Sequence, residues 1–80
     1  MDKLSVMSIR VDRRTDSAPK MQEILTKYGD IIIGRFGIHD PGEVDHGLIT
    51  LNIRADMERI NNIMEELESL DGIQANHMQA

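Results

Sequence analysis

The sequence contains no cysteine and no tryptophan, and its only aromatic residues are Tyr28 and Phe36. The lack of cysteine excludes disulfides and thiolate metal sites. One Tyr and one Phe do not make the aromatic platform on which nucleic-acid bases stack. No apolar run approaches the ~20 residues that cross a membrane, and the first residues lack the pattern of a signal peptide. These absences predict a cytoplasmic protein with no membrane partner.

Basic residues are also scarce, because nine Lys and Arg oppose 14 Asp and Glu and leave a formal net charge of −5. Nucleic-acid-binding modules normally carry a basic stripe, so this balance argues against direct contact with DNA or RNA. The 80 residues are 40% hydrophobic and 29% charged, a composition typical of ordered globular chains. A chain of this length builds one small core, and we expect residues 1–80 to form a single domain.

The hydrophobic period along the chain alternates between that of a strand and that of a helix. Strands are expected at residues 4–11, 31–38, 47–55 and 73–78, and helices at residues 19–28 and 57–70. Side-chain oxygens of residues 15–17 are expected to cap the first helix, and Asp56 the second. Met57 is expected to belong to the apolar stripe of the second helix, which Gly72 helps to end.

The two halves of the chain resemble each other. Residues 8–12 (SIRVD) lead into the first helix and residues 52–56 (NIRAD) into the second, while GDI at 29–31 and DGI at 71–73 follow the helices. A duplicated βαβ unit of this kind predicts an α+β, ferredoxin-like βαββαβ sandwich, with a four-stranded antiparallel sheet and both helices on one face.

The second strand is expected at an edge of this sheet, yet it is rich in Ile and Arg35 is its only charge. Apolar edges are normally blunted or covered, because unpaired backbone groups attract another strand. We therefore predict a homodimer or tetramer that pairs sheet edges or stacks sheet faces. The predicted oligomer edge consists of Ile31, Ile33, Arg35 and Gly37. The alternative is that loops of the same chain cover this edge.

Two regions contain side chains that suit a ligand. His39 and His46 flank an acidic turn, where imidazoles beside carboxylates suit a divalent metal such as Zn, Ni or Fe. Asp12, Arg13 and Arg14 lie in the loop that opens the first helix, where a helix N-terminus and two guanidiniums favour a carboxylate or phosphate. For both regions the alternative is a solvated polar loop. Nothing resembles a nucleophile elbow or a phosphate-cradling loop, so an enzyme is not expected.

Three segments resemble a known family: IGRFGI at residues 33–38 followed by a short acidic hairpin, LITLNI at 48–53 and LDGI at 70–73. They are similar to the family of regulators of the iron-only hydrogenase system. The resemblance extends from the first strand to the fourth. Members of that family have a ferredoxin-like fold, similar to ACT domains and to the C-terminal half of nickel-responsive repressors. The resemblance implies a self-associating, cytoplasmic regulatory domain tied to hydrogenase maturation or expression.

Two departures from these relatives narrow the function. ACT domains that bind amino acids usually have a Gly in the loop where this chain has DRRTDS at residues 12–17, so amino-acid binding of the usual kind is not expected. Nickel-responsive repressors use a Cys and carry a DNA-binding segment before this domain, and neither is found here. We therefore predict regulation through a small effector or a protein partner. The alternative is a structural or assembly protein that binds an enzyme subunit and senses no ligand.

Overall fold

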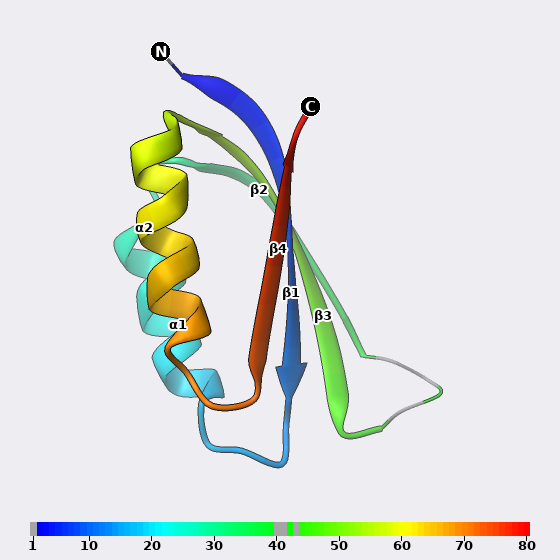
Figure 1. Ribbon diagram of the computed structural model, residues 1–80. Helices are drawn as coiled ribbons and strands as arrows, with labels where there is room; N and C mark the ends of the chain where they lie inside the picture. Colours follow the sequence, from blue (N-terminus) through cyan, green and yellow to red (C-terminus); the bar gives the residue numbers. More distant parts are fainter. Residues whose placement is uncertain (1, 40–41, 43) are drawn as a thin grey trace.

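The computed structural model describes residues 2–39, 42 and 44–80. Its elements are β1 (Lys3–Asp12), α1 (Ala18–Lys27), β2 (Ile32–His39), β3 (His46–Ala55), α2 (Met57–Glu68) and β4 (Ile73–Gln79). The strands form one sheet in the order β2-β3-β1-β4, and all neighbours are antiparallel. Both helices lie on the same side of this sheet (Figure 1). The ferredoxin-like fold predicted from the sequence is confirmed.

The core lies between the two helices and the central strands. The register of β1 and β3 pairs Met7 with Leu51 and Ile9 with Ile49, and these four side chains are buried. They pack with the buried stripe of α2, which consists of Ile60, Ile63 and Leu67. Full burial of one such side chain stabilises the fold by about 1.5–3 kcal/mol. The alternation read from the sequence therefore sets the inner face of both strands.

The two helices begin in different ways. Asp56 caps α2 as predicted, because its carboxylate accepts a hydrogen bond of 2.9 Å from the backbone N–H of Arg59. The predicted capping of α1 is wrong, since Ser17 makes no side-chain cap bond. Its hydroxyl instead donates to the carbonyl of Asp71 at 2.6 Å. The start of α1 is thereby tied to the turn that follows α2.

The N-terminal end of α2 departs from the expected stripe. Met57 is 39% exposed at the first turn, so the buried stripe is shorter than the sequence predicts. After the helix, Gly72 has a φ of 75°, a backbone conformation that a residue with a Cβ adopts only with strain.

Neither helix in the described ranges is long and apolar enough to cross a membrane.

Strand β2 forms one edge of the sheet, as predicted, and its start is irregular. The pairing with β3 shifts between Ile32 and Gly34, which leaves Ile33 in a bulge with 61% exposure. Ile31 precedes the strand, its side chain is buried in the core, and its carbonyl accepts a hydrogen bond of 3.0 Å from Arg54. Ile31 therefore belongs to the core and not to the predicted oligomer edge.

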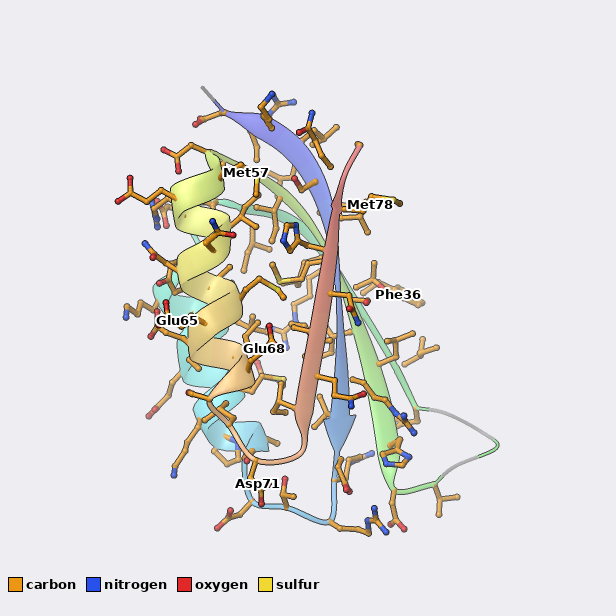
Figure 2. All side chains as sticks on the ribbon, in the orientation of Figure 1. Phe36, Met57, Glu65, Glu68, Asp71 and Met78 are labelled. Atoms are coloured by element: carbon orange, nitrogen blue, oxygen red, sulfur yellow. The ribbon has the colours of Figure 1, made fainter. Side chains whose placement is uncertain are left out.

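The side of the sheet away from the helices carries exposed apolar side chains. The register places Phe36 beside Thr50 and Met78 beside Val6 on this side. Figure 2 shows Phe36 and Met78 pointing away from α2. We call this surface the open sheet face, and its apolar residues, between 37% and 71% exposed, are Leu4, Val6, Phe36, Ile38, Leu48 and Met78.

Candidate functional site

One end of the sheet brings together the loop between β1 and α1 and the hairpin between β2 and β3. The backbone N–H of Arg13 donates to the carbonyl of Asp45 at 2.6 Å. The guanidinium of Arg13 also hydrogen-bonds Nδ1 of His39. Two residues that the sequence assigned to separate sites, one for an anion and one for a metal, are therefore neighbours.

A groove of about 340 Å³ lies between α1 and the β2–β3 hairpin, next to this contact. Val11, Met21 and Ile49 line it with apolar surface from three different elements, β1, α1 and β3. These three residues are at most 9% exposed and belong to the core, and we call them the floor of the groove. A small molecule that entered the groove would meet an apolar surface held in place by the core.

Strand β2 supplies the outer wall of the groove through alternate residues. Arg35, Gly37 and His39 share the face of β2 that points toward the helices, because Arg35 pairs with Leu51 and Gly37 pairs with Ile49. Gly37 leaves a gap between the two nitrogen-bearing side chains. A Cβ at Gly37 would lie 3.8 Å from Cγ1 of Ile49, so a side chain there would occupy the groove without a clash.

Neutral acceptors hold the two arginines of the groove. Nη2 of Arg35 donates to Oε1 of Gln22 on α1 at 2.7 Å, and Arg13 contacts the imidazole of His39. Arg59, in contrast, pairs with the carboxylate of Asp30 through two hydrogen bonds of 3.0 and 3.1 Å. The groove therefore presents guanidiniums whose described partners carry no negative charge.

The predicted cluster of Asp12, Arg13 and Arg14 is divided by the structure. Arg14 turns back on Asp12, with Nε to Oδ1 at 3.0 Å and Nη2 to Oδ2 at 2.8 Å. Hydrogen bonds from the side chain and backbone of Arg14 hold the pKa of the Asp12 carboxyl well below its usual range. Of the three residues, only Arg13 lines the groove.

The structure does not bring the two predicted metal ligands together. His39 faces the groove on the helix side, whereas His46 lies on the opposite side of the sheet, where its Nδ1 is 3.2 Å from Nη2 of Arg10. Asp40, Pro41 and Glu43, in the acidic turn, lie outside the described residues. Among the residues the structure does describe, no group of three or more His, Cys, Asp and Glu suits a metal ion.

A second hollow of about 330 Å³ lies beside Arg10, His46 and Gln74. Arg10 and Gln74 are paired on the outer side of β1 and β4, away from the helices. Among the described residues that line this hollow, Ile73 is the one buried large apolar side chain, whereas the groove has three, Val11, Met21 and Ile49. We therefore place the candidate site in the groove.

Sequence reasoning missed what Arg35, Gly37, Met21 and Gln22 contribute to the groove. It assigned Arg35 and Gly37 to an oligomer edge, and it gave no functional role to Met21 and Gln22. The alternation of Arg35, Gly37 and His39 on a strand was a usable signal, because residues two apart share a face. The contribution of α1 had no comparable signal, since it depends on how the helix lies across the sheet.

The fold and groove define the class of protein, a ferredoxin-like α+β domain of the ACT type. The ACT domain from GTP pyrophosphokinase of Chlorobium tepidum has a TM-score of 0.74 at 14% identity, covering 96% of this chain and 86% of that one. CPII, a nitrogen regulatory PII-like protein from Thiomonas intermedia K12, bound to ADP, AMP and bicarbonate, has a TM-score of 0.56 at 11% identity, covering 100% and 96%. At these identities the similarity shows the fold alone.

Within this class, residues 3–77 match the TM1266-like family, described as "Iron-only hydrogenase system regulator, putative". The chain belongs to this family, which confirms the resemblance read from its strands. The structure of the uncharacterized protein TM1266 from Thermotoga maritima has a TM-score of 0.90 at 19% identity, covering 99% of this chain and 98% of that one. No curated protein matches the chain significantly.

Proposed function

We propose that residues 1–80 form a cytoplasmic regulatory module of the iron-only hydrogenase system, which binds a small effector in the groove and acts as a homo-oligomer. The groove is the observation that carries this proposal. Its volume of about 340 Å³ suits a small molecule, and its lining combines a buried apolar floor with a few convergent polar groups. Membership of the family supplies the link to the hydrogenase system.

The regulatory role is supported by the relatives as well as by the groove. One structure of similar fold belongs to a nitrogen regulatory PII-like protein with nucleotides and bicarbonate bound. The formal net charge of −5 disfavours direct contact with nucleic acid, so the signal passes to a protein partner. In this proposal the chain carries out no catalysis, and binding of the effector changes the contact between the module and its protein partner.

A second copy of the chain is the proposed occupant of the open sheet face. Its six apolar side chains expose on the order of 500 Å² in total, at the upper end of what a typical monomer leaves uncovered. A stable dimer interface buries about 800 Å² on each partner, of which somewhat more than half is apolar. The exposed apolar area of this face therefore meets the requirement of a dimer.

Light scattering of the purified protein tests self-association. We expect a dimer or a larger assembly at micromolar concentration, and Met78→Glu should shift it toward the monomer by placing a charge on the open sheet face. Met57→Glu is the matched control, because Met57 is also exposed but lies on α2. A monomeric wild-type protein, or equal effects of the two variants, would contradict a dimer formed through this face.

Thermal unfolding in the presence of amino acids, nucleotides, organic acids and divalent metals tests effector binding. A specific ligand at ~100 times its Kd should stabilise the folded chain by about 2.7 kcal/mol. A response to any member of the panel that Gly37→Val removes supports the groove as the effector site. If no compound responds, the chain is better explained as an assembly protein that uses the open sheet face to bind an enzyme subunit.

A further inference from the structure

Arg13 and Arg35 are the basic side chains of the groove, and their present partners are weak competitors for an incoming anion. The described partners of both guanidiniums are neutral, an imidazole nitrogen for Arg13 and an amide oxygen at 2.7 Å for Arg35. A guanidinium and a carboxylate or phosphate attract each other as opposite charges and can form two parallel hydrogen bonds, which a single amide or imidazole acceptor does not offer. An anion that entered the groove would therefore replace His39 and Gln22 at a gain in free energy.

The described lining of the groove offers no negative charge that would bind a cation. Among the described residues that line the groove there is no Asp and no Glu, although the chain has 14 of them in total. The ammonium group of a zwitterionic ligand would lose water on entering and meet no carboxylate among these described lining residues. An unpaired charge in an apolar site is costly, so the groove discriminates against ligands that carry one.

The groove also has an apolar floor, which lines the same space as the two arginines. Val11, Met21 and Ile49 form its floor, and the missing side chain of Gly37 keeps that floor accessible. A ligand that consists of a charged group alone would leave these apolar side chains in contact with water. A short branched or cyclic hydrocarbon body would cover it and gain the free energy of apolar burial.

We propose that the groove selects a small organic anion, in which a carboxylate or phosphate group is joined to a short apolar body without any cationic group. Arg13 and Arg35 bind the anionic group, and the floor binds the apolar body. This inference rests on the proposed effector site and deepens it by naming the chemical class of the effector. It excludes ordinary α-amino acids, which have the same carboxylate but also an ammonium group.

Four probes with closely similar apolar bodies test the ligand class by isothermal titration calorimetry. They are 4-methylpentanoate, 3-methylbutyl phosphate, L-leucine and 4-methylpentan-1-ol, which carry in turn a carboxylate, a phosphate, a zwitterion and no charge. We expect one or both anions to bind roughly tenfold or more tightly than the alcohol, which lacks the charged hydrogen bonds, and than leucine, which keeps the carboxylate but buries an unpaired ammonium group. The comparison of the first two probes identifies the preferred anionic group.

Variants of the two arginines show whether the binding uses this groove. Arg13→Gln and Arg35→Gln should each weaken binding of the anion by roughly tenfold or more. Arg54→Gln is the control, because Arg54 is exposed on the opposite side of the sheet, where it pairs with Leu4. It removes the same formal charge and should leave the affinity unchanged. Urea unfolding of each variant verifies that the fold is retained.

Three results would overturn the inference. The first is an affinity for leucine that equals or exceeds the affinity for the anions. The second is a loss of affinity in Arg54→Gln as large as in the groove variants, which would indicate general electrostatic attraction. The third is a lack of binding by both anions. In the first and third cases the proposed function survives if another compound of the thermal panel binds in a Gly37-dependent manner, so the two failures are distinguishable.

Discussion

Two serines are buried among the described residues, Ser5 and Ser17, and they differ in whether the hydroxyl group has a hydrogen-bond partner. Ser17 is 5% exposed and donates a hydrogen bond to the carbonyl of Asp71 at 2.6 Å. Ser5 is 1% exposed on the helix-facing side of β1, and its Oγ has no hydrogen-bond partner within the described structure. Replacing each serine by alanine should therefore change the free energy of unfolding in opposite directions.

The magnitudes follow from what each substitution removes. Ser5→Ala relieves the cost of burying an unpaired hydroxyl, about 1–3 kcal/mol, and loses about 0.5 kcal/mol of packing because a small cavity replaces the oxygen. The net result is a stabilisation of about 1 kcal/mol. Ser17→Ala removes a formed hydrogen bond and the tie between α1 and the turn after α2, which costs about 1 kcal/mol.

Urea and thermal unfolding of the two variants measure this difference. For a chain of 80 residues, 1 kcal/mol corresponds to a shift of about 6 °C in Tm. All samples need the same protomer concentration, because self-association would add a concentration-dependent stabilisation. If Ser5→Ala lowers the Tm as much as Ser17→Ala does, the hydroxyl of Ser5 is stabilising and the reasoning from its burial is refuted.

Two further predictions concern the groove and the loop beside it. Gly37→Ala should leave the free energy of unfolding unchanged or raise it by about 0.5–1 kcal/mol, because its Cβ meets Ile49 at an ordinary 3.8 Å and a strand favours Ala over Gly. The same variant should weaken effector binding in calorimetry, and unchanged affinity would contradict the site. Because Arg14 lowers the pKa of Asp12, the stabilisation from this carboxylate is complete above its unfolded pKa of about 4 and is lost as the pH falls below it. Asp12→Asn should therefore reduce the acid dependence of Tm between about pH 4 and pH 2, and a slope equal to that of the wild type would argue against the pairing.

The sequence by itself determined the order of the elements and the inner face of the central strands. The alternation of Met7 and Ile9 in β1, and the cap formed by Asp56, depend on neighbours within a few residues. Interactions of that range can be predicted from the local pattern of apolar and polar residues, because side chains on one face recur every two residues in a strand and every 3.6 residues in a helix. The repeat between the two halves then restricted the topology to one fold.

The tertiary structure alone decided which side chains meet. Register and face place His39 in the groove and His46 on the other side of the sheet, although only six residues separate them. Tertiary structure also decides two hydrogen bonds. The hydroxyl of Ser17 donates to the carbonyl of Asp71, 54 residues away along the chain, and Arg35 donates to Gln22 on a separate element. Such contacts follow from how the helices pack across the sheet, and that packing minimises exposed apolar area over the whole chain instead of within any one segment.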